Sequence, residues 1–139
     1  MKILFAADGS PFTKKALAFL GANPEMLAGG ELAVLHVQPP LPPRVTSMVG
    51  TRTVADYQKE EAEAILAPIE AFLRRHPLQF TVAWKVGAPA ETIVETARAE
   101  HARLIVMGTH GHGLLGRALM GSVAQKVLHD ADIPVLLVK

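Results

Sequence analysis

Short apolar runs alternate along this chain with segments whose apolar residues recur at helical spacing. Continuous apolar runs of four to six residues are typical of buried parallel strands, and alternating apolar and polar residues are typical of a half-exposed strand. The expected buried strands are 3–7, 32–37 and 104–107, the expected last strand is 134–138, and the expected half-exposed strand is 80–84. With a helix between consecutive strands, this pattern predicts an α/β fold: an open parallel sheet with helices on both faces.

The segments between these strands carry helix signals. Ser10 can cap a helix that Pro11 begins, and Pro89 can begin another. A long helix is expected over residues 51–75, with a kink at Pro68 because a proline inside a helix removes a backbone donor. A further helix is expected around Val123, Val127 and Leu128. Residues 39–50 begin with four prolines in five positions, which predicts an irregular loop that either is functional or only crosses the sheet.

Composition limits the class of protein. A chain of 139 residues is expected to form one domain, and a net charge of +1 gives no electrostatic footprint for nucleic acid or an anionic membrane. The chain has no cysteine, which excludes disulfides and cysteine-ligated metals. It also has no apolar run of the roughly 18 residues that a membrane span needs. Asp8 interrupts the first apolar run too early for a signal peptide, so a soluble cytoplasmic protein is expected.

A glycine-rich segment follows the 104–107 strand and precedes the last helix. It runs from Gly108 to Ser122 and includes Gly111, Gly116 and Gly121. Glycines let backbone N–H groups turn toward a ligand, and the N-terminus of the next helix favours an anion. Ligands of open α/β sheets bind at this carboxyl end of the strands. The segment therefore predicts a phosphate-binding loop.

Three phosphate-loop patterns fit parts of this segment. Gly111, Gly113 and Gly116 match the dinucleotide pattern G-x-G-x-x-G, but Asp130 and Asp132, the acids at nearly the right distance, precede the final strand instead of ending it. Gly116 to Gly121 has the glycine spacing of a Walker A loop, but Ser122 stands where that loop needs its lysine. The third pattern is Gly108-x-x-Gly111, nine further residues and then Gly121-Ser122.

This third pattern closely resembles the nucleotide loop of the universal stress protein family, in its ATP-binding branch. The resemblance extends over the whole chain, from the opening strand with Asp8-Gly9-Ser10, through Leu35-His36-Val37 and the glycine loop, to the closing segment 133–139. It implies a Rossmann-like five-stranded sheet of order 3-2-1-4-5. It also implies a set of nucleotide-binding residues. Ala7, Asp8 and Val37 would flank adenine and ribose, Met107 and Gly108 would close the other side, and Gly111, Gly121, Ser122 and Val123 would hold the phosphates.

Two further residues of the loop are candidates for phosphate contact. Arg117 is a candidate because its guanidinium is always charged, and His110 is a candidate from its place in the loop, with solvent exposure as the alternative. Asp8 could act on a ribose or a metal, or it could cap the turn into the first helix. His36 is expected to be a hydrogen-bonded core histidine. No metal ligand set is expected, because His110 and His112 have no partner at a zinc-site spacing.

These residues predict a binding and signalling module that takes ATP, or ADP or AMP, with Mg²⁺ held through the phosphates. No catalytic base is evident beyond Asp8 or a loop histidine, so the chain is not expected to be an enzyme. A slow nucleotide phosphohydrolase and a protein-interaction domain with a purely structural glycine loop are the alternatives. The resemblance also implies a homodimer through the C-terminal strand Pro134–Val138.

Overall fold

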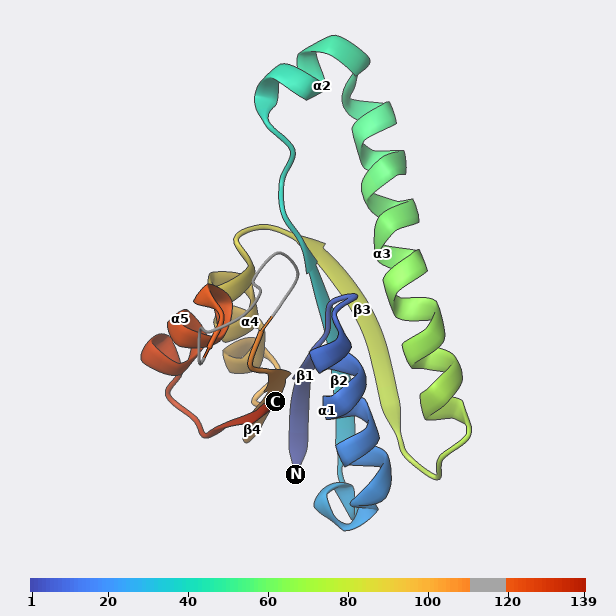
Figure 1. Cartoon of the computed structure of the whole chain (residues 1–139), viewed down its shortest axis with the longest axis vertical. Helices are drawn as coiled ribbons and strands as arrows, with labels where there is room; N and C mark the ends of the chain where they lie inside the picture. The colour runs from blue at the N-terminus through green and yellow to red at the C-terminus, as the bar shows by residue number, and fades with distance from the viewer. Residues whose placement is uncertain (111–119) are drawn as a thin grey trace.

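The structure, a computed structural model, describes residues 1–110 and 120–139 (Figure 1). Within these residues a five-stranded sheet has the order β3-β2-β1-β4-β5, and every neighbouring pair is parallel. The strands are β1 (Lys2–Ala6), β2 (Glu31–Gln38), β3 (Phe80–Val86), β4 (Leu104–Gly108) and β5 (Val135–Val138). The predicted fold class and strand order are confirmed.

Helices cover both faces of the sheet. The helical segments are α1 (Pro11–Ala22), the 3₁₀ turn η1 (Pro24–Leu27), α2 (Pro43–Val49), α3 (Thr51–Arg74), α4 (Pro89–Ala99) and α5 (Ser122–Asp130). One face of the sheet packs on α1 and α3, and the other packs on α4 and α5. Figure 1 shows this layering, with α2 and the first part of α3 reaching beyond the sheet.

Alternation within the strands builds the two cores. Ile3 and Phe5 of β1 face α1 and α3, whereas Leu4 faces α4 and α5. All three side chains are fully buried, as expected for a strand with helices on both faces. Strand β3 lies at a sheet edge and alternates half-buried with exposed residues from Phe80 to Lys85, as its sequence predicts.

The proline-rich segment differs from its prediction. Residues 43–49 form helix α2, so an irregular loop over 39–50 is wrong for that part. Pro43 is the first helical residue, where the missing N–H is not needed by the helix and the fixed φ favours it. Pro68 lies inside α3, which continues through it to Arg74. Its side chain is exposed, so the carbonyl that it leaves unpaired is on the solvent side.

The strand order places a switch point between β1 and β4. The chain leaves β1 toward β2 on one side, and β4 and β5 extend the sheet on the other. Crossovers from neighbouring strands then run on opposite faces, and a crevice opens at the carboxyl ends of the two strands. The residues that follow β1 and β4, Ala7 and Thr109, are therefore placed at the mouth of this crevice.

Candidate functional site

A cavity of about 370 Å³ opens at the carboxyl ends of β1, β2 and β4. It extends from the end of β2 to the start of α5, across the switch point. Its lining consists of Ala6, Ala7, Asp8, Thr13, Leu35, His36, Val37, Gln38, Pro39, Ile65, Pro89, Ile93, Met107, Gly108, Thr109, His110, Gly121, Ser122, Val123 and Ala124. All described residues that the sequence singles out as nucleotide contacts are in this lining. Gly111 and Arg117, the remaining two, lie outside the described residues.

Asp8 organises the turn between β1 and α1. Its Oδ1 accepts hydrogen bonds from the backbone N–H of Ser10 and from the hydroxyl of Thr13, each at 2.8 Å. The Ser10 hydroxyl in turn accepts from the Thr13 N–H at the start of α1. Asp8 is therefore a turn-capping residue, one of its two expected roles. It also lines the cavity, and no described residue bonds its Oδ2, so the carboxylate is available to a ligand hydroxyl.

The start of α5 forms one end of the cavity. Gly121 is the N-cap and has no side chain to satisfy the first helical donors. The first backbone bond back to this end is from Gln125 N–H to Gly121 O, so no described residue accepts from the N–H groups of Ser122, Val123 and Ala124. All three residues line the cavity. Free N–H groups and the positive end of the helix dipole make this end an anion site.

The other end of the cavity lies at the end of β2 and is mostly apolar. Val37 and Pro39 line it from the β2 side, and Ile65 lines it from α3. Its polar side chains in the described lining are the buried His36 and Gln38. His36 Nδ1 lies 2.9 Å from the carbonyl oxygen of Ala7 and Nε2 lies 2.6 Å from the Gln38 side chain. The prediction that His36 is a hydrogen-bonded core histidine is confirmed.

The described part of the cavity lining has little charge. It holds no lysine or arginine, and Asp8 is its acid. Positive potential there comes from backbone N–H groups rather than side-chain cations. Within residues 1–110 and 120–139, no group of three or more histidine and acidic side chains is placed to hold a metal ion. In the same residues, no helix has the length and apolarity needed to cross a membrane.

Sequence reasoning missed part of the lining. Gln38 and Thr109 directly follow positions that it used, so the rule that ligands bind at strand ends could have included them. Ile65 and Ile93 come from the middle of helices, where an apolar residue predicts only packing. Nothing in the local sequence distinguishes them from other core residues, and only the tertiary fold brings them to the cavity.

The family model described as "Universal stress protein family" matches residues 1–139, the whole chain. The chain belongs to the universal stress protein family. A curated universal stress protein of Thermus aquaticus is 38% identical over 140 residues, which cover 99% of this chain and 97% of that protein. Among solved structures, the protein MJ0577 is 30% identical with a TM-score of 0.83, and the match covers 99% of this chain and 94% of that one.

A more distant universal stress protein was solved with a nucleotide. The Archaeoglobus fulgidus protein, in complex with dAMP, is 23% identical with a TM-score of 0.73, and the match covers 100% of this chain and 98% of that chain. At this identity the likeness shows that the two proteins share the universal stress protein fold.

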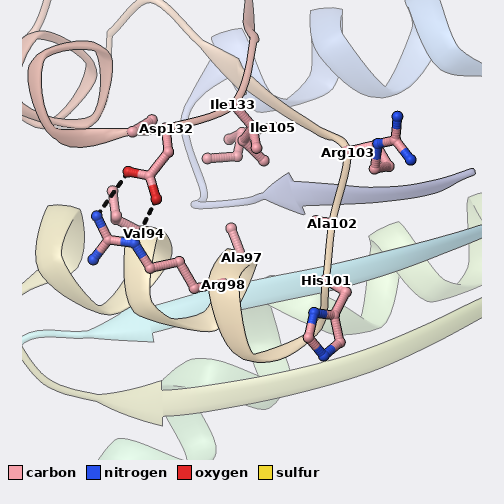
Figure 2. A pocket seen from close by; sticks show the side chains of 10 residues that line it. Val94, Ala97, Arg98, His101, Ala102, Arg103, Ile105, Asp132 and Ile133 are labelled. Atoms are coloured by element: carbon pink, nitrogen blue, oxygen red, sulfur yellow. Dashed lines mark hydrogen bonds and ion pairs between the residues drawn. The ribbon is translucent and has the colours of Figure 1, made fainter.

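A second cavity of about 300 Å³ lies at the opposite end of the sheet (Figure 2). It is bordered by the end of α4 and the segments that lead into β4 and β5, and its floor includes the buried Ala97, Ala102 and Ile105. Arg98 binds Asp132 at its rim through Nε at 3.0 Å and a terminal nitrogen at 2.8 Å. None of the candidate nucleotide residues that the structure describes reaches this cavity.

Proposed function

We propose that this universal stress protein binds an adenine nucleotide, ATP in preference, in the 370 Å³ cavity and acts as a nucleotide-dependent stress-response module. The observation that carries this proposal is the pairing of two unlike ends in one cavity. One end has the N–H groups of Ser122, Val123 and Ala124, which no described residue accepts from, and the other has an apolar lining around Val37. A nucleotide has the same polarity, with phosphates at one end and an apolar base at the other.

The proposal assigns a part of the nucleotide to each candidate residue. The base lies between the ends of β1 and β2, near Ala7 and Val37, and Asp8 accepts from the ribose hydroxyls. Met107 and Gly108 close the opposite side. The phosphates lie on Gly121, Ser122 and Val123, with Gly111, His110 and Arg117 completing the loop around them. Magnesium is bound through the phosphates rather than by a protein ligand set.

The dAMP complex of the Archaeoglobus fulgidus protein supports this proposal at the level of the fold. It shows that a protein with this architecture can hold an adenine nucleotide. The roles of individual residues rest on the cavity of this chain and on its glycine pattern. In particular, the G-x₂-G-x₉-G-S pattern has Gly121 and Ser122 at the N-terminus of α5, where a phosphate finds donors.

We further propose that the protein holds and reports the nucleotide and does not turn it over rapidly. Oδ1 of Asp8 already accepts two hydrogen bonds, so this carboxylate is held as a turn cap and is a poor base for activating water. Any hydrolysis of ATP should then be slower than roughly one turnover per minute, far below the 1–1000 per second of dedicated enzymes.

The test combines detection of the native ligand with calorimetry and turnover. Mass spectrometry of protein purified without added nucleotide should detect a bound adenine nucleotide. Calorimetry should show ATP binding at least about ten-fold tighter than NAD, because no acid ends a strand where a second ribose would need it. Absence of any nucleotide binding would favour a protein-interaction domain, and hydrolysis at many turnovers per second would favour a phosphohydrolase.

A further inference from the structure

His36 and Gln38 form a buried hydrogen-bonded pair at the base end of the cavity. They are two residues apart on β2, so both side chains lie on the face that packs against α1 and α3. His36 is 4% exposed and Gln38 is 9% exposed, yet both line the cavity. Of the other polar side chains in the described lining near β1, Asp8 and Thr13 bond each other in the turn before α1. This pair is therefore placed to distinguish one base from another.

The contacts of His36 fix the position of its proton. Its Nδ1 lies 2.9 Å from the backbone oxygen of Ala7. A carbonyl oxygen can only accept a hydrogen bond, so Nδ1 carries a hydrogen and donates it. The groups that His36 contacts are neutral, and no described carboxylate reaches the ring. In a neutral imidazole only one ring nitrogen carries a hydrogen, so with Nδ1 as the donor Nε2 has none.

This tautomer fixes the orientation of the Gln38 amide. Nε2 can then only accept, and the Gln38 group at 2.6 Å must donate. A half-turn of the amide about its last bond places the NH₂ group at this position and moves no other atom. The carbonyl oxygen of Gln38 then points away from His36. The Gln38 amide atom that faces away from His36 has no partner among the described residues, so it is open to a ligand in the cavity.

We propose that Gln38 reads the base by accepting a hydrogen bond from a 6-amino group, with His36 as the positioning residue that holds the amide in this orientation. This inference rests on the proposed nucleotide function and adds the choice of base to it. Adenine has an amino group at position 6, whereas hypoxanthine and guanine have an oxygen there. An oxygen would face the Gln38 oxygen without a hydrogen between them, and a buried acceptor without a donor is penalised.

The test is a cycle of ligands and variants. AMP, IMP and purine riboside 5′-monophosphate, which lacks the 6-amino group, are titrated into wild type and Gln38→Met by calorimetry. In wild type, loss of the amino group should weaken binding about five-fold, and IMP should bind at least about ten-fold more weakly than AMP. In Gln38→Met these ligands should bind within about two-fold of one another, since methionine has the length of glutamine but no strong acceptor.

Two variants control the cycle. Gln58 is a glutamine of α3 that is equally buried but does not line the cavity, so Gln58→Met should keep the wild-type order of ligands. Gln38→Glu keeps an acceptor toward the ligand but exchanges the donor to His36 for a carboxylate, which Nε2 can bind only by taking up a proton; AMP should still bind ahead of IMP. Binding of AMP by Gln38→Met with undiminished discrimination would overturn the inference and leave the nucleotide site standing. Failure of wild type to bind any of the ligands would overturn the nucleotide site and the inference with it.

A second measurement does not depend on any variant folding. The ¹⁵N shifts of the His36 ring in the wild-type protein report which nitrogen carries hydrogen. The expected result is a protonated Nδ1 and an unprotonated Nε2. A ring protonated at both nitrogens, or at Nε2 alone, would reverse the Gln38 amide and overturn the inference.

Discussion

The backbone N–H of Gly121 donates to the carbonyl oxygen of Thr109 at 2.6 Å, so the N-terminus of α5 is held against the end of β4. Thr109 is anchored in turn by its own N–H, which donates to the Val138 carbonyl of β5. The free donors of Ser122 and Val123 are thereby fixed relative to the sheet and not only to their own helix. A phosphate that binds them meets donors already in place.

Gly121→Val should weaken ATP binding, and its loss of affinity should be several-fold larger than that of Ser122→Ala. Any side chain at 121 would occupy space beside the free donors, and each charge-assisted hydrogen bond to phosphate that is lost is worth about 1.5–3 kcal/mol. Ser122→Ala removes a hydroxyl and keeps the backbone donor. Calorimetric titration of ATP into both variants makes the comparison. Unchanged ATP binding by Gly121→Val would show that α5 does not hold the phosphates.

Gly108 provides the close approach between β4 and α1. A Cβ at this position would lie 2.5 Å from the Cβ of Phe12 and 3.0 Å from its carbonyl carbon. Gly108→Ala should therefore lower the free energy of unfolding by about 1–3 kcal/mol, measured by urea titration. Because the contact is with Cβ and backbone, truncation of the side chain by Phe12→Ala should not rescue the variant. A rescue would place the clash on the aromatic ring instead.

Two variants separate the structural role of Asp8 from its proposed role in ligand binding. Asp8→Asn keeps an Oδ1 that can accept from Ser10 and Thr13, so the free energy of unfolding should stay within about 0.5 kcal/mol of wild type. Asp8→Ala removes the cap and should cost about 1 kcal/mol or more. Both should weaken ATP binding, because the charged acceptor for ribose is lost. If Asp8→Asn bound ATP with wild-type affinity, the role of Asp8 would be limited to capping the turn between β1 and α1.

The sheet could be predicted from the sequence because each strand has its own local signal. Continuous apolar runs identify β1, β2, β4 and β5, and the alternation from Phe80 to Trp84 identifies β3. Helix α2 could not be predicted in this way. Its prolines at 42 and 43 precede or begin the helix, where proline is tolerated, and none of its residues is buried to give a periodic stripe.

Some residues of the cavity could likewise be predicted from the sequence, and others could not. Asp8 and Val37 were expected at the site from the resemblance to the universal stress protein family, and both line the cavity because the ends of parallel strands meet at one edge of the sheet. The orientation of the Gln38 side-chain amide could not be predicted, because it depends on a contact with His36 and on the carbonyl of Ala7, which follows the neighbouring strand β1. Local sequence assigned His36 to the core, which is correct, but contains no signal that its hydrogen bonds reach the cavity.

The Arg98–Asp132 pair at the second cavity predicts a pH dependence (Figure 2). The hydrogen bond from Arg98 holds the pKa of Asp132 below its ordinary value of 3.8. The ionised carboxylate therefore contributes stability at pH values above about 4, and this contribution is lost as the pH falls through the lowered pKa. The urea midpoints of wild type and Arg98→Gln should differ at pH 7 and converge as the pH falls through the lowered pKa of Asp132. An unchanged difference at low pH would assign the effect of Arg98 to packing.

The C-terminal strand β5 is a sheet edge, and two copies of the chain are expected to pair there as a homodimer. Its residues are apolar and half-buried, and exposed apolar edges are usually covered. The carbonyls of Pro134 and Val138 accept from Ile105 and Thr109, so these residues direct their backbone toward β4. Because direction alternates along a strand, Val135 and Leu137 direct theirs to the open edge.

Proline substitution at alternate positions of β5 tests this pairing. Val135→Pro removes a donor from the open edge and leaves the β4 side intact, so sedimentation velocity should show a folded monomer where wild type sediments as a dimer. Leu136→Pro removes a donor that faces β4 and should lower the free energy of unfolding instead. Far-ultraviolet circular dichroism distinguishes the two effects. A monomeric wild type at tens of micromolar would show that β5 does not form the interface, and a dimeric Val135→Pro would show that the interface does not depend on the outward N–H of residue 135.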